Sequence, residues 1–509
     1  MIGPRSPPPA APLMTEASAV SLGLTFDNSY GRLPERFYAR QAPVPVAEPR
    51  LIRLNRALAE AIGLDTALDD SLLAEVFAGN RLPEGADPLA QAYAGHQFGG
   101  FSPQLGDGRA LLLGEVIARD GRRLDLQLKG AGRTPFSRQG DGRAALGPVI
   151  REYLVSEAMA ALGIPTTRAL AATATGQPVY REGALPGAVL TRMASSHIRV
   201  GTFQYFAARG DRDALERLTA HVIARHYPAA GEAANPALAL LEAVLERQAG
   251  LIARWLHVGF IHGVMNTDNC SIAGETIDYG PCAFMDAYDP GTVYSSIDQQ
   301  GRYAFANQPV MAHWNLARFA ESLLDLIDAE QERAIDKATE VLSGFAPRFR
   351  QHWLDGMYRK IGLAHPSEAD GPLVQALLEA MQAGQADYTN SFRALGAAAL
   401  GPEGREAMRR QFIGMAGIDE WLTRWQARLA AEGRAPAHVA AGMNAVNPAF
   451  IPRNHRVQQA IDGALAGDYS PFEALHRVLS RPYDDQPEAA AYTAPPEPDE
   501  RVLRTFCGT

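Results

Sequence analysis

The chain has 509 residues, of which 47% are hydrophobic and 21% charged, values that are ordinary for a folded globular protein. They exclude a mostly disordered, collagen-like or coiled-coil chain. With 48 Lys and Arg against 57 Asp and Glu the net charge is -9, which argues against a nucleic-acid binder or a membrane-surface protein. We therefore expect small-molecule or protein partners, with no nucleic acid and no membrane among them.

Cysteine use and apolar runs indicate the compartment. Three cysteines occur, Cys270, Cys282 and Cys507, without the spacing of a zinc site or of a disulfide framework. No run reaches the roughly 18 apolar residues of a membrane-spanning helix, and the start lacks the basic-then-apolar order of a secretory signal. We expect a cytoplasmic protein that acts as a monomer.

The first 90 residues precede the residues that carry chemistry. Residues 1–20 are rich in Pro and Ala and have no apolar period, which predicts a disordered tail. Residues 21–90 are expected to form an N-terminal extension. Within it, Leu51, Leu54, Leu58 and Ile62 fall on one helical face, so residues 49–64 are predicted to be helical.

Residues 91–200 predict a small lobe rich in β-structure. Alternating apolar runs predict a β-hairpin with strands at 111–117 and 124–129 and a turn at Asp120-Gly121. A helix is predicted at 149–162, ended by Gly163 and Pro165. The short apolar runs at 169–174 and 187–193 predict two more strands.

Residues 201–484 predict a large helical lobe. Apolar residues recur with a period of about 3.6 at 241–256 and at 316–327, and a polar, Gly-broken segment at 259–289 lies between these two helices. Residues 485–509 open with a Pro- and acid-rich stretch, which predicts a flexible C-terminal tail. A β-rich lobe followed by a helical lobe predicts an α+β fold.

The polar segment has the pattern of a protein-kinase catalytic loop. In HGVMNTDN, residues 262–269, His and Asn have the separation found in H-R-D-L-x-x-x-N. Further on, Asp278-Tyr279-Gly280 has the form of the kinase D-F-G, whose Asp holds the nucleotide's magnesium. Because Mg²⁺ prefers hard oxygen ligands, Asn269 and Asp278 predict a cation site beside phosphates. Taken singly, each is also typical of loops and helix caps.

Val264 breaks the kinase pattern. It stands where the kinase loop has its Asp base, and a valine can neither orient nor deprotonate a hydroxyl. Ordinary phosphoryl transfer is therefore not expected. Asp268 is the carboxylate inside the loop to which a base role is open, and the alternative is that it only supports the metal.

Lys129 ends the second strand of the predicted hairpin, as the phosphate-pairing lysine of V-A-I-K does in kinases. Its partner is expected on the next helix, where Glu152 and Glu157 both qualify. Five residues at 100° each place these two about 140° apart, so only one can point at Lys129. The sequence leaves this choice open.

Two Gly-Asp-Gly-Arg clusters flank the hairpin strands. In the first, Gly106 and Gly108 can bring backbone N–H groups close to phosphate, and Arg109 adds a bidentate donor. The second cluster contains Asp141 and Gly142 and lies just before the helix. Each cluster alone is also typical of a plain turn.

Arg192 and Arg199 bracket the passage from the predicted strands to the helical region. Arginine presents several donors in a planar fork that matches phosphate geometry. The convergence of several arginines with Lys129 predicts a clamp for a polyphosphate. Solvated surface arginines are the alternative, since arginine is commonly exposed.

These motifs together resemble the selenoprotein O family of protein-kinase-like proteins. The resemblance runs from about Phe26 to the C-terminus. It is carried by YAGHQFGGF (93–101), QLGDGRA (104–110), QLKGAGRTPFSR (127–138), GDGRA (140–144), REYLVSEAM (151–159), GIPTTRAL (163–170), HGVMNTDN (262–269), TIDYGP (276–281) and NPAFIPRNH (447–455).

The resemblance implies a two-lobed, protein-kinase-like fold with N- and C-terminal extensions that binds ATP turned around. Such a pseudokinase transfers AMP, rather than phosphate, to Ser, Thr or Tyr hydroxyls of proteins and releases pyrophosphate. It also implies a role for each matching residue: phosphate contact for Lys129, paired with Glu152; nucleotide binding for Gly106, Gly108, Arg109, Asp141, Gly142, Arg192, Arg199 and Asp278; Mg²⁺ or Mn²⁺ ligation for Asn269 and Asp278; and proton acceptance for Asp268.

The resemblance also implies redox control by the last cysteine. Members of this family carry a selenocysteine or cysteine near the C-terminus, and Cys507 matches that position. Its partner in a disulfide is then Cys270 or Cys282, which flank Asp278, and the sequence does not choose between them. The alternative is that all three thiols stay reduced, as is usual in the cytosol.

Two other functions compete with AMP transfer. One is a true protein kinase that uses Asp268 as its base, which Val264 argues against. The other is an ATP-binding regulatory scaffold without turnover. The complete set of Lys129, Asn269 and Asp278 argues against the scaffold, because a scaffold needs no pair of metal ligands.

Overall fold

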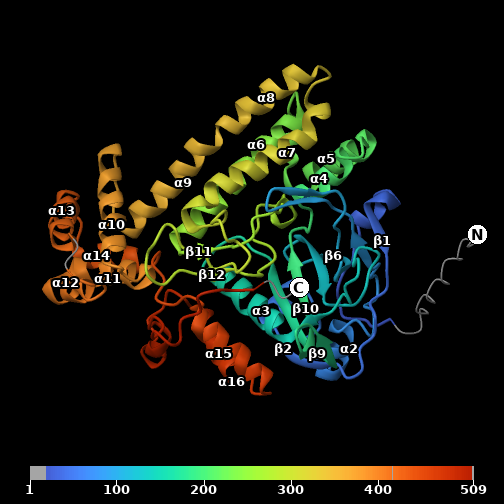
Figure 1. The fold of residues 1–509 in the computed structure, drawn as a ribbon, viewed down its shortest axis with the longest axis horizontal. Coiled ribbons are helices and arrows are strands. Elements are labelled where there is room, and N and C mark those ends of the chain that lie inside the picture. Colours follow the sequence, from blue (N-terminus) through green and yellow to red (C-terminus); the bar gives the residue numbers. More distant parts are fainter. Residues whose placement is uncertain (1–18, 415–416, 507–509) are drawn as a thin grey trace, which may run out of the picture.

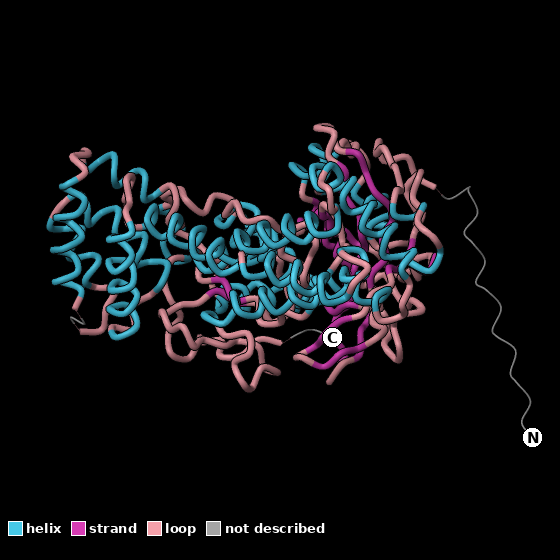
Figure 2. Tube along the Cα trace, turned by 90° about the horizontal axis from the view of Figure 1, so that it is seen from above, coloured by secondary structure: helices cyan, strands magenta, loops and turns pink. Residues whose placement is uncertain are grey.

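The computed structural model describes residues 19–414 and 417–506. It is a mixed α+β structure with an antiparallel sheet, in which the strands gather in one region and long helices extend away from it (Figures 1 and 2). Of the tail predicted at residues 1–20, residues 1–18 lie outside the described residues, whereas Val20 is buried and forms a parallel bridge with Pro83.

One sheet dominates the first 200 residues, and its strand order is β1-β3-β6-β7-β10-β9-β2, with β8 beside β10. Every pairing within it is antiparallel. Its strands are β1 (Tyr38–Arg40), β2 (Arg50–Leu54), β3 (Leu89–Gln91), β6 (Ala110–Ile117), β7 (Arg123–Lys129), β8 (Ala144–Ala145), β9 (Arg168–Tyr180) and β10 (Ala184–Ala194). The expected N-terminal extension thus contributes strands β1, β2 and β3 to this sheet.

The predicted hairpin is confirmed as β6 and β7, and the two predicted strands after it are confirmed as the longer β9 and β10. The predicted helix at 149–162 is confirmed as α3 (Leu146–Ala161). In β10, Val189 and Leu190 belong to different hydrophobic clusters, because alternate side chains leave a strand on opposite faces. One face packs on α1 (Arg56–Ile62) and α2 (Asp70–Phe77), and the other packs on α3.

The helix predicted at 49–64 is wrong in its first half. Residues 50–54 form strand β2, which pairs with β9 through Arg50↔Ala174 and Leu54↔Ala171. The edge of β9 offers unpaired backbone groups, and pairing with it outweighs the helical apolar period of the segment. The helix begins only after Asn55, whose side chain accepts a hydrogen bond from Leu58 N at 3.2 Å.

The rest of the chain is mainly helical, as predicted, and the helices at 241–256 and 316–327 are confirmed within α6 and α7 (Figure 1). Two short strands, β11 (Phe260–Ile261) and β12 (Ala283–Phe284), pair in the polar segment between them. The helices are α4 (Val200–Ala207), α5 (Arg212–His226), α6 (Pro236–His257), α7 (Gln308–Ile327), α8 (Gln331–Ser343), α9 (Phe345–Lys360), α10 (Gly371–Ala383), α11 (Tyr388–Leu400), α12 (Pro402–Arg409), α13 (Ile418–Ala431), α14 (Pro436–Asn444), α15 (Asn454–Leu465) and α16 (Ser470–Leu479).

The end of the chain returns to the sheet region. Helices α15 and α16 pack on α3, so residues far apart in sequence share one hydrophobic cluster (Figure 1). The expected tail contains a short 3-10 helix at Pro487–Tyr492, with Ala489 buried. Further on, Thr505 N donates to Tyr294 O at 2.8 Å and Thr505 Oγ1 donates to Pro281 O at 2.6 Å. Cys507 lies outside the described residues.

The NPAFIPRNH segment has a structural part in the fold. Arg453 is 1% exposed, and its guanidinium pairs with Asp286 at 2.7 Å and with Asp387 at 2.8 Å. The next residue, Asn454, donates from Nδ2 to Phe284 O at 3.1 Å. The segment therefore ties β12 and the start of α11 to α15.

We expect Arg453→Leu to lower the free energy of unfolding by about 3–5 kcal/mol, because the buried carboxylate of Asp387 and the half-buried carboxylate of Asp286 lose their cation. Urea unfolding measures this change. Arg456→Leu is the matched control, because this neighbouring arginine has a half-buried side chain without a carboxylate partner among the described residues, and we expect a much smaller loss. Equal losses for the two variants would contradict this role of Arg453.

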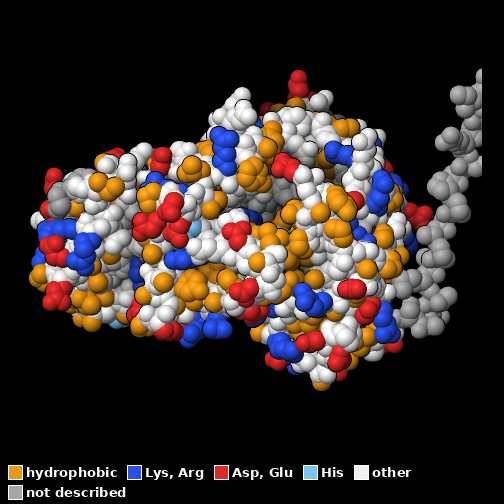
Figure 3. Space-filling view, turned by 60° about the horizontal axis from the view of Figure 1, so that its bottom comes forward, with side chains coloured by type: hydrophobic (Ala, Val, Ile, Leu, Met, Phe, Trp, Pro, Cys, Tyr) orange, Lys and Arg blue, Asp and Glu red, His pale blue; other side chains and the backbone are white. Residues whose placement is uncertain are grey.

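No helix in the described part of the chain is long and apolar enough to cross a membrane. On the face drawn in Figure 3, Lys and Arg side chains are interspersed with Asp and Glu and with hydrophobic residues. Neither sign of charge dominates the described surface of that face.

Candidate active site

A cavity of about 550 Å³ brings together the sequence motifs that carry chemistry, and its volume is usual for small-molecule sites. Side chains from the sheet and from the loops before α7 both line it. Of the predicted nucleotide, metal and base residues, the cavity wall contains Gly106, Gly108, Arg109, Lys129, Asp141, Gly142, Arg192, Arg199, Asp268, Asn269 and Asp278.

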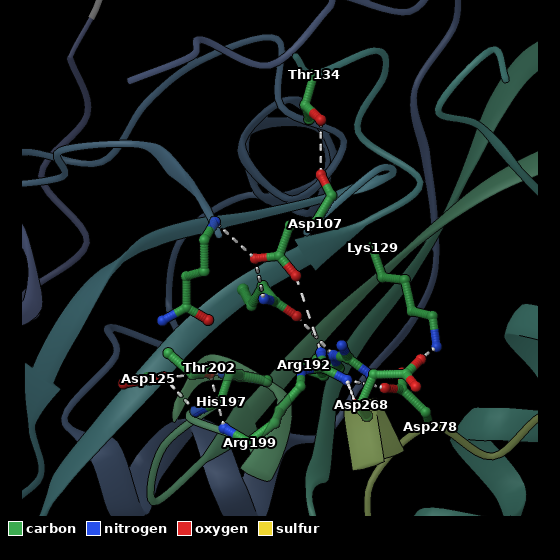
Figure 4. A network of polar contacts seen from close by, with 12 residues as sticks. Asp107, Asp125, Lys129, Thr134, Arg192, His197, Arg199, Thr202, Asp268 and Asp278 are labelled. Atoms are coloured by element: carbon green, nitrogen blue, oxygen red, sulfur yellow. Dashed lines mark hydrogen bonds and ion pairs between the residues drawn. The ribbon is translucent and has the colours of Figure 1, made fainter. Parts of the chain in front are cut away.

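Asp278 lies at the centre of a cluster of cations (Figure 4). Its Oδ1 accepts hydrogen bonds from Lys129 Nζ at 2.9 Å and from Arg192 Nη1 at 2.7 Å, and its Oδ2 accepts from Arg199 Nη1. Burial would raise the pKa of this carboxyl, but the three cations hold it well below its usual range. Asp278 also adopts a positive φ of 63°, which Asp tolerates better than most residues and which aims the carboxylate inward.

Glu152 is the helix partner of Lys129. Its Oε2 accepts from Lys129 Nζ at 2.6 Å, and its Oε1 accepts from Arg192 Nη1 at 3.0 Å. Glu157 lies on another face of α3, where it pairs with Arg168 at 2.8 Å. The sequence left both glutamates open as partners of Lys129, and the position of β7 against α3 selects Glu152.

The two arginines are set deep in the cavity wall. Arg192 is 2% exposed and also donates from Nε to Gln127 Oε1 at 2.7 Å, while Arg199 donates to the carbonyl of Asp268 at 2.7 Å. Arg199 also lies over the ring of Tyr93, 4.7 Å from its centroid. Both arginines are therefore fixed in place by several contacts, and this reduces the entropy lost when a ligand binds.

Glycine is required at two positions of the Gly-Asp-Gly-Arg clusters. Gly106 has a φ of 80° and its Cβ position is filled by Phe136, while Gly142 has a φ of 70° and abuts the backbone of Gly132. Asp141 pairs with Arg181 at 2.9 Å at the cavity edge. Backbone and charged groups of both clusters thus face the same cavity.

The catalytic-loop pattern forms a rigid unit with the Asp-Tyr-Gly segment. His262 Nε2 donates to the carbonyl of Ile277 at 2.9 Å, directly before Asp278. Asn269 Nδ2 donates to Val264 O at 3.0 Å, which leaves the amide oxygen as its atom for an incoming ligand. Val264 itself lines the cavity with an apolar side chain.

Asp268 has the properties of a poised carboxylate. It is 8% exposed, burial raises its pKa to about 6, and Arg199 opposes that rise. Its Oδ2 accepts from Gln97 Nε2 at 3.3 Å, whereas its buried Oδ1 has no hydrogen-bond partner among the described residues. A buried oxygen without a hydrogen-bond partner is a candidate to hold a proton or a ligand.

The oxygen atoms of this loop fit a hard divalent cation. Asp278, Asn269 and Asp268 supply carboxylate and amide oxygens to one cavity, and the Asp268 oxygen is orphaned. Within the described residues, no group of three or more His, Cys, Asp and Glu side chains forms a metal site. Mg²⁺ is usually bound by one or two protein carboxylates together with phosphate oxygens, and the carboxylates of this loop would suit that mode of binding.

Asp107 belongs to the site although its residue type and position gave no signal beyond a turn. It is 1% exposed, its Oδ2 accepts from Gln91 N at 3.1 Å, and its Oδ1 lies 3.8 Å from Arg199. Burial raises its pKa to about 6. Only the folding of the glycine cluster against β3 reveals this further carboxylate at the cavity (Figure 4).

Both cysteines of the polar segment are buried, and burial raises the pKa of Cys270 to about 12. The C-terminal segment makes its contact next to Cys282 and not next to Cys270. Thr505 Oγ1 donates to the carbonyl of Pro281, the residue directly before Cys282. The last described residues therefore end beside Cys282.

A buried lysine, two arginines and acidic loop residues around one cavity define a class of proteins that bind and act on nucleotide phosphates. The family model described as "Protein adenylyltransferase SelO" matches residues 20–480. The chain belongs to this family and is a protein nucleotidyltransferase, which confirms the resemblance and function predicted from the sequence.

Curated relatives are similar over almost their whole length. A "Protein nucleotidyltransferase YdiU" of Rhizobium etli (strain CIAT 652) is 63% identical over 97% of this chain and 99% of its own. The protein of the same name from Rhizobium johnstonii is 64% identical over 95% of this chain and 97% of its own. The protein of the same name from Bradyrhizobium sp. (strain ORS 278) is 62% identical over 95% of this chain and 99% of its own.

Proposed function

We propose that the protein transfers AMP from ATP to Ser, Thr or Tyr hydroxyls of other proteins and releases pyrophosphate, using a two-lobed, protein-kinase-like fold in which ATP is reversed. One observation carries the proposal. Val264 lines the cavity where a kinase has its base, while Asp268 and the Asp278 cluster surround the same space. The site thus holds the cations and carboxylates of nucleotide chemistry without the kinase base.

In the proposed reaction, the acceptor hydroxyl attacks the α-phosphorus and the bond to the bridging oxygen of pyrophosphate breaks. Asp268 accepts the hydroxyl proton, since its Oδ1 has no protein partner among the described residues. Arg192, Arg199 and Lys129 neutralise the charge that develops on pyrophosphate, and their fixed positions avoid reorganisation during the step.

Asn269 and Asp278 would hold Mg²⁺ or Mn²⁺. The ion would supply a positive charge that neutralises phosphate oxygens. Lys129, Arg192 and Arg199, which donate to the Asp278 carboxylate in this structure, would also be the donors to phosphate. Protein substrates and a monomeric enzyme are part of the same proposal.

The test uses ATP labelled at either the α- or the γ-phosphate, incubated with the purified chain, each metal and a reductant. Label bound to protein only from the α-phosphate supports AMP transfer. Label only from the γ-phosphate would restore the kinase hypothesis. ATP binding without either label would favour the ATP-binding regulatory scaffold and overturn the proposal.

We expect Glu152→Gln to lower AMP transfer by about 10²-fold or more, because Lys129 and Arg192 lose the carboxylate that orients them. Glu157→Gln is the matched control, since it neutralises a fully hydrogen-bonded carboxylate on the same helix, whose partners are Arg168, Asn55 and the backbone of Ala169 outside the cavity. Transfer of α-label at saturating ATP measures both. A similar loss in the two variants would mean that α3 is merely destabilised.

We propose that Cys507 forms a reversible disulfide, and the contact of Thr505 with Pro281 favours Cys282 over Cys270 as its partner. Each thiol gives up one proton and one electron to an external disulfide such as oxidised glutathione. We expect Cys282→Ser, and not Cys270→Ser, to remove the effect of oxidant on activity. Non-reducing peptide mapping measures the pairing, and a Cys270–Cys507 peptide would contradict it.

A further inference from the structure

A small hairpin from the sheet region leans over the catalytic loop, and the proposed chemistry does not use it. Its strands are β4 (Gly95–Gln97) and β5 (Gly100–Ser102), from the YAGHQFGGF segment. His96 N donates to Thr267 Oγ1 at 2.7 Å, and Phe98 N donates to Asn266 Oδ1 at 3.1 Å. The hairpin is thus fastened to the residues directly before Asp268.

The hairpin tip presents an aromatic ring from an unfavourable backbone position. Phe98 and Gly99 have φ values of 51° and 88°, a turn that favours Asn or Gly at both positions. A phenylalanine in the left-handed region is strained, and such strain is typical of functional sites. The Phe98 ring is nevertheless 37% exposed, and it lines the cavity.

Two more apolar side chains extend this surface. Phe101, across the hairpin, is 42% exposed and packs on His96 with ring centroids 4.8 Å apart and the rings tilted by 42°. Ile297, from the segment between the Asp-Tyr-Gly residues and α7, is 56% exposed and lines the cavity beside Phe98. Large exposed apolar groups around the entrance of a polar cavity are typical of a binding surface.

One cation adjoins these apolar groups. A side chain at Gly99 would contact the guanidinium of Arg302, 3.9 Å away, so Arg302 lies against the hairpin tip. Its guanidinium packs over the ring of Trp314, 4.9 Å from the centroid. Among the described residues no carboxylate lies within ion-pair distance of it, unlike Lys129, Arg192 and Arg199 inside the cavity. Its charge is therefore available to an acidic partner.

We infer that Phe98, Phe101, Ile297 and Arg302 form the acceptor rim, the surface that docks the protein segment carrying the acceptor hydroxyl. The occupant is an extended peptide segment with an apolar side chain beside the hydroxyl and a carboxylate within reach of Arg302. Phe98 and Ile297 of the rim line the same cavity as Gln97 and Asp268, so a segment docked on them has its hydroxyl next to the base. This inference rests on the proposed AMP transfer to proteins.

The test is a degenerate peptide library with a fixed central Ser, Thr or Tyr, incubated with ATP labelled at the α-phosphate. We expect labelled peptides to be enriched in an apolar residue next to the acceptor and in Asp or Glu nearby. Phe98→Asn removes the ring and suits the positive φ, so the turn is kept. It should raise the KM for selected peptides about tenfold with little change in kcat or in the KM for ATP.

Matched variants separate docking from folding and from chemistry. Arg302→Gln should abolish selection for Asp and Glu and keep the apolar preference. Leu400 is 61% exposed at the end of α11, and Leu400→Ser should change neither the acidic nor the apolar preference. If wild type labels peptides but Phe98→Asn keeps the same KM and the same selection, the acceptor rim is refuted while AMP transfer stands. If wild type labels no peptide or protein at all, the proposed function itself fails.

Discussion

Asp278→Asn is expected to abolish measurable AMP transfer and to lower the free energy of unfolding by about 3–5 kcal/mol in metal-free buffer. The side chain keeps its shape but loses the charge that balances Lys129, Arg192 and Arg199. These three cations are then left with Glu152 and with the carboxyls of Asp107 and Asp268, whose pKa values are raised. Incorporation of α-label and urea unfolding measure the two effects.

A buried acid outside the cavity shows whether lost stability alone explains lost transfer. Asp387 is 7% exposed and holds Arg453 through two hydrogen bonds, at 2.8 and 3.1 Å. Asp387→Asn should also lower the free energy of unfolding, yet transfer should persist at temperatures where the variant is folded. Full transfer by folded Asp278→Asn would refute the place of Asp278 in the site.

Local patterns predicted most of the elements near the site. The alternation in 110–129 predicts β6 and β7 because the two strands of a hairpin are close in sequence and pair with each other. Asp120-Gly121 lies in the turn between them, after the last pair, Ile117↔Arg123. The stop signal of Gly163 and Pro165 similarly predicts the end of α3, since such a signal acts within a few residues of the helix terminus. Strand β2 was mistaken for helix because its partner, β9, lies more than a hundred residues away.

The same limit applies to the site. The sequence identified Lys129, Asn269 and Asp278 because their motifs have fixed spacings, but it did not choose between Glu152 and Glu157. That choice depends on how α3 is rotated against the sheet, and α3 packs on β9 and β10 as well as on α15 and α16 near the end of the chain. Asp107 was missed for a related reason, since a Gly-Asp-Gly cluster predicts a turn, and its burial depends on tertiary contacts with Gln91 and Arg199.

The charges of Asp278 and Asp268 have opposite effects on the stability of the fold. Asp278 has a lowered pKa because cations surround it, so its ionised form stabilises the fold. Asp268 has a pKa raised to about 6 by burial, so at pH 7, above both its folded and unfolded values, its ionised form disfavours the fold. Residues only ten positions apart thus have opposite effects on the fold and line the same cavity.

Asp268→Asn should therefore lose activity without losing stability. We expect AMP transfer to fall by about 10²–10⁴-fold, the usual contribution of a positioned general base, while the affinity for ATP is kept. The free energy of unfolding in metal-free buffer at pH 7 should equal or exceed that of the parent, because a buried charge is replaced by a neutral amide. Single-turnover transfer, fluorescent ATP titration and urea unfolding measure these three quantities.

The combination of results distinguishes the roles open to Asp268. Lost transfer with ATP affinity and stability intact assigns the proton to this carboxylate, since a group that only supports the metal would also weaken metal-dependent ATP binding. The orphaned Oδ1, which faces no protein donor in the described part of the chain, is the atom that would take the proton. Unchanged transfer would instead mean that solvent deprotonates the hydroxyl. No carboxylate of the loop would then replace the kinase base that is missing at Val264.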